Sequence, residues 1–235
     1  MRRHTVARRG PGSAGSAGTA AVAEPARPVK ATRKGRETDA AFRQGARTVF
    51  ARDGYLNAKI SDIAGAAGKS VASFYNYYDS KADLLVALAE DFHAETTRLA
   101  QLPYSEGRTP REALREAVAG FWHTYADRRG ELIGIFQAAM FDPEFAGRWL
   151  DIRARAIRNI AAEIRHAQRE GYCPGIDPDL TASSLSAMIE QFCYVWQAQG
   201  GDRIAGEFTA DKAIDTLSSV WFHALYWKPA QDWRP

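Results

Sequence analysis

The sequence has few of the features that mark membrane, secreted or metal-binding proteins. None of its apolar runs approaches the ~18 residues that a membrane-spanning helix requires. The Arg-rich start MRRHTVARRG is followed by Gly, Ser and Ala instead of the apolar segment of a secretory signal. The two cysteines, Cys173 and Cys193, lack metal-ligand spacing and suggest no disulfide framework. We therefore expect a protein of the reducing cytoplasm, with no membrane partner, metal or cofactor.

Positive charge is concentrated at the amino-terminal end of the chain. Residues 1–36 hold nine Lys or Arg and one acidic residue, whereas the rest of the chain is net acidic. The stretch GPGSAGSAGTAA has too little apolar surface to fold, so residues 1–36 are predicted to be a disordered tail. Basic arms of this kind commonly lie along nucleic acid, and Arg33, Lys34 and Arg36 are candidate DNA contacts. A solvated tail without a partner is the alternative.

Beyond residue 28 the pattern is helical almost throughout. Apolar residues recur with a 3.6-residue period between Gly and Pro stops, and strand-type alternation is absent. Asp142 and Asp177 each precede a proline, Pro143 and Pro178, which is typical of an N-cap followed by the first helical position. The sequence predicts an all-α fold of nine helices, at about 38–53, 60–67, 71–77, 80–102, 110–128, 130–140, 142–171, 177–200 and 210–227.

Residues 60–78 fit a helix-turn-helix. Ala64 is small enough to let two helices approach closely, and Gly68, four positions later, permits the positive φ of the turn. Phe74 and Tyr78 lie four residues apart on the second helix, so both are predicted to face the core.

The opposite face of the second helix is predicted to contact DNA. The phenols of Tyr75 and Tyr77 face outward there, where they can donate to phosphate oxygens. Lys81 lies at the amino end of the following helix, whose free amides and positive dipole end favour an anion. Short polar side chains suited to the major groove share this surface: Ser70, Ser73 and Asn76. A small helical hairpin with ordinary exposed tyrosines is the alternative.

The stretch ISDIAGAAGKSVASFYNYYDSKADLL, with ARTVFARDGYLNAKI before it, resembles the amino-terminal DNA-binding domain of the TetR family of bacterial transcriptional repressors. The resemblance covers residues 38 to about 88. It implies a homodimer on a palindromic, double-stranded operator, a DNA-binding domain over 37–82, and a domain over 83–228 that binds a small inducer. It places the recognition helix at Val71–Tyr77 and assigns DNA contact to Ser73, Tyr75, Asn76, Tyr77 and Lys81.

The sequence departs from the family at the start of that helix. Members often have a basic or amide residue where Val71 stands, so Val71 and Ala72 are limited to apolar contact, for example with a thymine methyl. Lys59 completes the predicted DNA-binding set.

The second half of the chain is rich in bulky apolar side chains, which between helices either fill the core or line a ligand cavity. We expect most to be core and some to bind a small hydrophobic or aromatic ligand. Candidates to orient it are the polar side chains His123, Tyr125, Gln137 and Gln191. The candidate lining residues are Phe121, Trp122, Tyr125, Phe136, Met140, Trp149, Met188 and Phe192.

The last two predicted helices are apolar nearly all round, over Leu185–Trp196 and Ile214–Leu225. A helix without a polar face must be covered on both sides, by the core and by a second subunit. We expect a homodimer through these helices. We also expect the helix-turn-helix to meet the ligand domain only through the helix at 80–102. Bound ligand is then expected to swing this helix.

Two other function classes compete with a regulator. The motif E-x-x-H occurs at Glu90/His93 and at Glu163/His166, and paired motifs of this kind hold di-iron centres in helical bundles. On a helical wheel Glu90 and His166 face away from their helices' apolar sides, which argues against such a centre. A purely structural helical adaptor explains the bundle but not the helix-turn-helix. No nucleotide loop, H-E-x-x-H motif or nucleophile elbow is present, so no enzyme activity is expected.

Overall fold

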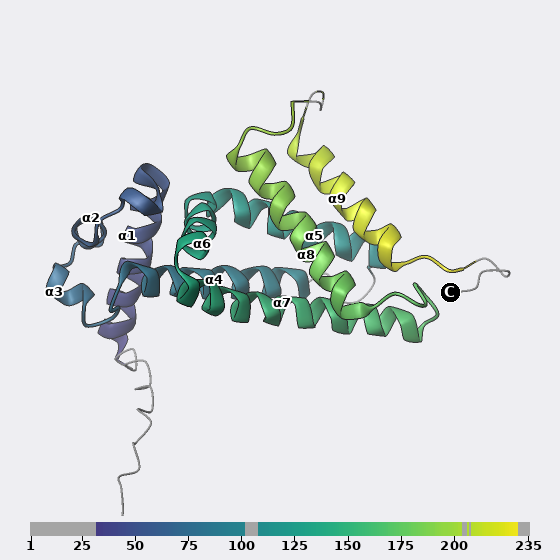
Figure 1. The fold of residues 1–235 in the computed structure, drawn as a ribbon, viewed down its shortest axis with the longest axis horizontal. Coiled ribbons are helices and arrows are strands. Elements are labelled where there is room, and N and C mark those ends of the chain that lie inside the picture. Colours follow the sequence, from purple (N-terminus) through teal and green to yellow (C-terminus); the bar gives the residue numbers. More distant parts are fainter. Residues whose placement is uncertain (1–31, 102–107, 204–205, 207, 230–235) are drawn as a thin grey trace, which may run out of the picture.

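The computed structural model describes residues 32–101, 108–203, 206 and 208–229. Over these residues the fold is all-α, as predicted, with nine α-helices, one π-helical turn and no strand. α1, α2 and α3 form a small group at one end of the molecule, and the long α4 leads from it into the other helices (Figure 1). α7 runs beside α4, α8 packs on α7, and α9 packs on α5 (Figure 1). No described helix is long and apolar enough to cross a membrane.

The helix bounds follow the predicted order. They are α1 Arg33–Asn57, α2 Ile60–Ala66, α3 Val71–Phe74, α4 Lys81–Gln101, α5 Pro110–Asp127, α6 Arg129–Phe141, α7 Pro143–Arg169, α8 Pro178–Cys193, the π-helical η2 Tyr194–Ala198 and α9 Ala210–Leu225.

Side-chain caps fix several of these starts. Asp142 accepts hydrogen bonds from the amides of Glu144 and Phe145, and Asp177 accepts one from Leu180, which confirms both predicted N-caps. Each cap is followed by proline in the first helical position, where a missing N–H has no consequence.

The first helix begins earlier than predicted. Thr32 caps it by accepting a hydrogen bond from the amide of Gly35, and Arg33 pairs with Glu37 one turn later. Arg33, Lys34 and Arg36 therefore lie in the first turn of α1, and the predicted tail boundary at residue 36 is wrong for these positions. The remainder of the predicted tail, residues 1–31, lies outside the described residues.

Two other helices also differ from their predicted bounds. α3 ends at Phe74, three residues early, and hydrogen-bonded turns carry the chain on to Tyr78. α8 ends at Cys193, and the π-helical η2 continues the chain to Ala198. Periodicity predicted α-helix for both segments because, over four to seven residues, the spacing of apolar side chains does not tell which backbone hydrogen bonds form.

Candidate DNA-binding surface, its link to the second domain and an apolar cavity

The turn between α2 and α3 has the geometry that its sequence predicts. Gly68 has a φ of +63°, in the left-handed region, and the amide of Lys69 donates to the carbonyl of Ala64 at 2.9 Å. Phe74 is fully buried against Phe42 of α1, with ring centroids 5.5 Å apart. Tyr78 is also buried, so the predicted core positions of this hairpin are confirmed.

The opposite side of α3 presents polar and apolar groups to solvent. Tyr75 and Val71 are exposed, as are Ala72 and Asn76. Lys59, Ser70 and the three basic residues of the first turn of α1 are exposed as well. Ser73 is half-buried. The structure thus leaves most of the predicted DNA contacts accessible on one small domain.

Two predicted contacts have partners inside the protein. The ring of Tyr77 is half-buried and lies 5.7 Å from that of Phe42, so it belongs partly to the core. The ammonium of Lys81 donates to the carbonyl oxygens of Tyr55 at 2.6 Å and Ala58 at 2.8 Å, and lies over the Tyr55 ring. Partial burial lowers the pKa of Lys81. Lys81 is therefore better described as tying the start of α4 to the end of α1 than as a free phosphate contact.

The first helix also packs directly on α6, more extensively than on α4. Gly130 makes this possible, because a Cβ there would lie 2.9 Å from backbone atoms of Phe50 and Ala51. A Cβ on Gly134, one turn further, would lie 2.8 Å from the Cβ of Tyr55. The expectation that the helix-turn-helix meets the second domain only through the helix at 80–102 is wrong, since α6 forms a second connection.

A network of charged groups joins the same three helices. Arg43 of α1 donates to Asp91 of α4 at 2.8 Å, and Arg47 donates to the other oxygen of Asp91 at 3.1 Å. Arg47 also donates to Glu131 of α6 at 2.9 Å. Glu131 is only 2% exposed, and burial raises the pKa of its carboxyl although Arg47 and Arg128 lower it. The network therefore connects α1, and with it the helix-turn-helix, to both α4 and α6.

The network extends to the recognition hairpin. Asp39 of α1 accepts a hydrogen bond from Arg43 at 2.8 Å and another from the hydroxyl of Tyr78. Burial and this contact with Asp39 raise the pKa of Tyr78. A continuous path of polar contacts thus runs from α6 through α1 and α4 to Tyr78, one turn after α3.

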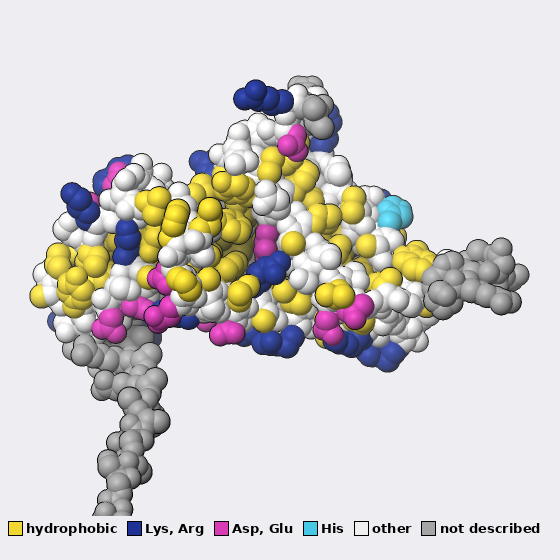
Figure 2. Space-filling view, viewed as in Figure 1, with side chains coloured by type: hydrophobic (Ala, Val, Ile, Leu, Met, Phe, Trp, Pro, Cys, Tyr) yellow, Lys and Arg dark blue, Asp and Glu magenta, His cyan; other side chains and the backbone are white. Residues whose placement is uncertain are grey.

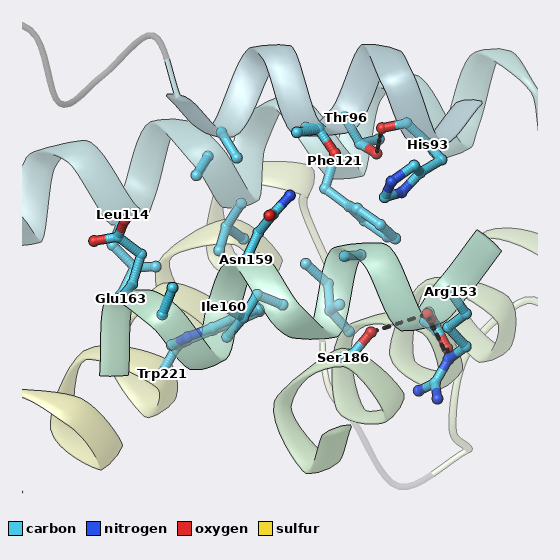
Figure 3. A pocket seen from close by; sticks show the side chains of 18 of the residues that line it. His93, Thr96, Leu114, Phe121, Arg153, Asn159, Ile160, Glu163, Ser186 and Trp221 are labelled. Atoms are coloured by element: carbon cyan, nitrogen blue, oxygen red, sulfur yellow. Dashed lines mark hydrogen bonds and ion pairs between the residues drawn. The ribbon is translucent and has the colours of Figure 1, made fainter. Parts of the chain in front are cut away.

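An apolar cavity of about 300 Å³ lies among α4, α5, α7, α8 and α9. Most of its lining is aliphatic or aromatic, while polar side chains come mainly from α4, α7 and α8 (Figure 3). On α4 the lining begins at Phe92 and His93, directly after Asp91 of the charged network. Its apolar members include Phe92, Leu114, Val118, Phe121, Trp149, Ile152, Ile160, Ile189, Trp221 and Leu225.

Two of the eight predicted ligand residues, Phe121 and Trp149, line this cavity. Met140 is 76% exposed near the end of α6. Apolar side chains gather on the surface over α6 and the neighbouring end of α8 (Figure 2). The other five do not line the cavity: Trp122, Tyr125, Met188 and Phe192 belong to the core or pack against it, and Phe136 packs on Tyr194. These six therefore do not line this cavity, because residue type does not tell which face of a helix meets a cavity.

The polar lining also differs from the prediction. None of His123, Tyr125, Gln137 and Gln191 lines the cavity, and His123 and Gln191 are exposed. The polar side chains that do line it are His93, Thr96, Thr97, Arg153, Asn159, Glu163, Ser186 and Glu190. Among these, His93 and Glu163 were noticed in the sequence only as parts of E-x-x-H motifs.

The di-iron interpretation finds no support in the geometry. Glu90 pairs with Arg155, and His166 pairs with Glu170 at 3.4 Å. Over the described part of the chain, no three His, Cys, Asp or Glu side chains are grouped as a metal site would need.

Two sequence profiles match the chain, one in each half. Residues 43–88 match the bacterial regulatory proteins of the tetR family, and residues 114–227 match the carboxy-terminal domain of the transcriptional regulator EthR. The chain belongs to the TetR family. It is therefore a DNA-binding transcriptional regulator, and its matched curated relatives are regulators and not enzymes.

Individual TetR-family relatives are distant in sequence. The regulator EthR of Mycolicibacterium smegmatis is 24% identical over 82% of this chain and 88% of its own. The repressor AcnR of Corynebacterium diphtheriae is 28% identical over 63% of this chain and 72% of its own. Among solved structures, a TetR-family regulator from Rhodococcus sp. aligns with a TM-score of 0.68 at 18% identity, over 81% of this chain and 99% of that one. GusR of Salmonella enterica aligns with a TM-score of 0.66 at 21% identity, over 83% and 98%.

Proposed function

We propose that this protein is a repressor that binds a palindromic operator as a homodimer and leaves it when an apolar molecule fills the cavity. Several curated relatives are named as repressors, which supports repression as the direction of control. The exposed polar groups directly after α3, Tyr75 and Asn76, and the basic first turn of α1 supply the two kinds of contact that DNA binding needs.

The recognition surface divides into base and phosphate contacts. Asn76 is exposed and carries an amide, which pairs well with adenine in the major groove. Tyr75, 47% exposed, offers a phenol to the phosphate backbone. Val71 is exposed and apolar, which suits a thymine methyl.

The homodimer is proposed to form through α8 and α9. Leu180 at the start of α8 is 70% exposed, and Val220 of α9 is 49% exposed. A two-fold axis beside these helices would cover both and would match the symmetry of a palindromic operator. Sedimentation equilibrium of the protein and of a Val220→Glu variant tests this, since the variant is expected to be a monomer with much weaker operator binding.

One observation carries the proposed induction. On α4, Asp91 holds Arg43 and Arg47 of the DNA-binding domain, while the next two residues, Phe92 and His93, line the cavity. A ligand that moves this turn of α4 also moves the groups that hold α1. Recognition helices must keep a fixed separation to enter two half-sites together, so such a movement weakens operator binding.

The experiment is a DNA-shift titration on duplex sequences enriched by the protein from a random pool, with the DNA upstream of its own gene in parallel. We expect a palindromic sequence that competes far better than random duplex of equal length. Apolar molecules that raise the melting temperature are then expected to weaken the shift by roughly 5- to 150-fold. Equal affinity for the enriched and random duplexes would refute specific operator binding.

A further inference from the structure

The polar groups of the cavity are unevenly placed along its length. Arg153, Ser186 and His93 lie toward one end, and Glu163 lies toward the other, beside Leu114 (Figure 3). Arg153 and Glu163 both belong to α7, so the lining extends over about 15 Å at the usual helical rise. The cavity is thus elongated, with a distinct polar end.

A buried ion pair forms the floor of that polar end. The Nε of Arg153 donates to both carboxylate oxygens of Glu190, at 2.9 and 3.1 Å, and Ser186 donates to one of them at 3.0 Å. The two charged side chains are only 16% and 19% exposed. The guanidinium points away from Phe121 and His93 (Figure 3). A carboxylate has about four acceptor positions, so Glu190 retains acceptor capacity beyond these three bonds.

The hydroxyl groups at this end are also acceptors. Ser186 commits its proton to Glu190, and Thr96 commits its proton to the carbonyl of Phe92 at 2.9 Å. Each hydroxyl oxygen then has only lone pairs to offer a ligand. Apart from the imidazole of His93, which can donate or accept, the polar groups at this end therefore need a hydrogen-bond donor from the molecule that fills the cavity.

Formal charge on a ligand is disfavoured at the polar end, and negative charge is disfavoured at both ends. A carboxylate would face Glu190 or Glu163, and an ammonium at the polar end would face Arg153. Because the charges of Arg153 and Glu190 cancel, this ion pair does not require a ligand of opposite charge. His93 adds none, because burial and the nearby Arg155 lower the pKa of its imidazole.

We infer that the cavity binds an uncharged, elongated apolar molecule that carries a terminal hydrogen-bond donor, such as a hydroxyl group, placed against Glu190, Ser186 and Thr96. This inference rests on the proposed function and specifies its ligand class. A buried acceptor left without a donor loses its bond to water and gains nothing in return, so the cavity discriminates against molecules that lack the donor.

The test uses four probes with a common phenylbutyl body and different ends: phenylbutanol, its methyl ether, phenylbutylamine and phenylbutanoic acid. Calorimetry with the full chain measures the affinity of each near neutral pH. We expect the alcohol to bind at least about tenfold more tightly than the ether, the usual scale of a hydrogen bond to a charged group. We also expect it to bind more tightly than the amine or the acid.

Two matched double variants locate the effect. Arg153→Met with Glu190→Leu replaces the buried pair by apolar groups, a change that such pairs often tolerate, and is expected to abolish the preference for alcohol over ether. Arg155→Met with Glu90→Leu removes a neighbouring, more exposed pair between the same helix and α4 that does not line the cavity. This control is expected to keep the preference.

Each other outcome counts against the inference. Equal binding of alcohol and ether would show that the cavity does not require a hydrogen-bond donor. Tightest binding of the acid or the amine would show that the cavity selects a charged ligand. Binding of none of the four would refute the proposed ligand class. Retention of the preference in the Arg153→Met, Glu190→Leu protein would place the donor elsewhere. Operator binding without ligand is measured separately, so failure here leaves the proposed DNA binding standing.

Discussion

Arg47 of α1 and Glu131 of α6 form an ion pair across 2.9 Å that joins the DNA-binding domain to the second domain. The carboxylate side chain is 3% exposed and the arginine side chain 26% exposed. One oxygen of Glu131 has no hydrogen-bond partner. A buried carboxylate with an unused acceptor is costly to keep ionised, which is why burial raises the pKa of Glu131.

This shift predicts how stability depends on pH. A carboxyl whose pKa is raised in the folded state holds its proton more tightly there, so its contribution to stability falls as pH rises above its ordinary value of 4.5. We expect the free energy of unfolding of the native protein, relative to that of Glu131→Gln, to fall as the pH rises above 4.5. Urea denaturation at several pH values measures it. Glu37→Gln on the exposed face of α1 is the control, and a rise in the native protein would contradict the prediction.

The contact between α1 and α6 gives a second prediction. In Gly130→Ala the new Cβ would lie 2.9 Å from backbone atoms of α1, which cannot rotate away, so α6 must shift. We expect the free energy of unfolding to fall by about 1–3 kcal/mol. Gly147→Ala in α7 meets nothing within 4 Å and is expected to be neutral or stabilising by up to about 1 kcal/mol. Denaturant unfolding compares the two, and equal effects would mean that α6 does not need glycine at its contact with α1.

The sequence predicted the local structure better than the contacts between helices. Periodicity and caps such as Asp142 and Asp177 depend on neighbouring residues, so the order and most bounds of the helices were predictable. The approach of Gly130 to α1 depends on residues about 80 positions away, and no local pattern encodes it. In a helical sequence pattern, an isolated glycine indicates only a lower helix propensity and gives no sign of a close contact with another helix.

The cavity was less predictable than the DNA-binding surface. Phe121 lines it, whereas Trp122, the next residue of α5, is buried in the packing against Phe192 and Phe208. A change of 100° around the helix separates the two roles, and both positions are aromatic. In the hairpin, by contrast, the spacing of Phe74 and Tyr78 fixed which face was buried and left Tyr75 and Asn76 exposed.

The two exposed residues of the hairpin are expected to act differently on DNA. Asn76→Ala should reduce discrimination at particular base pairs by about 1–3 kcal/mol, because a base contact specifies sequence. Tyr75→Phe should weaken all duplexes alike, because a phosphate contact positions the protein without reading sequence. Binding to a panel of single-base operator variants measures both. A uniform loss of affinity in Asn76→Ala would show that this side chain does not read a base.

Lys81 and Lys59 provide a matched pair of cations near the DNA-binding surface. Lys81 is tied to carbonyl groups at the end of α1, whereas Lys59 is exposed just before α2. We expect Lys81→Met to lower the free energy of unfolding by about 1–3 kcal/mol, through loss of charged hydrogen bonds. Lys59→Met should leave stability unchanged and reduce the salt dependence of DNA binding by about one unit of log–log slope. If Lys81→Met instead reduced the salt dependence of DNA binding and left stability unchanged, Lys81 would be the phosphate contact.

Coupling between ligand and DNA is expected to depend on Asp91. In the native protein, Asp91 holds both Arg43 and Arg47 of α1 and precedes the cavity residues Phe92 and His93 on α4. Asp91→Asn keeps the shape of the side chain and removes the charge that holds the two arginines. Ligand should still bind, because Asp91 does not line the cavity, and operator should still bind, because α3 is unchanged.

The quantity to measure is the ratio of ligand affinities for free and operator-bound protein. Because linkage is reciprocal, this ratio equals the factor by which ligand weakens operator binding, roughly 5- to 150-fold for a typical allosteric coupling of 1–3 kcal/mol. Calorimetry with and without operator, using the tightest of the probes, is expected to give a ratio near one in Asp91→Asn and a large ratio in the native protein. The control is Glu90→Gln, the adjacent position on α4, whose carboxylate pairs with Arg155 of α7 and not with α1. The same ratio in Asp91→Asn as in the native protein would mean that coupling passes through α6 or through the backbone of α4 instead of this carboxylate.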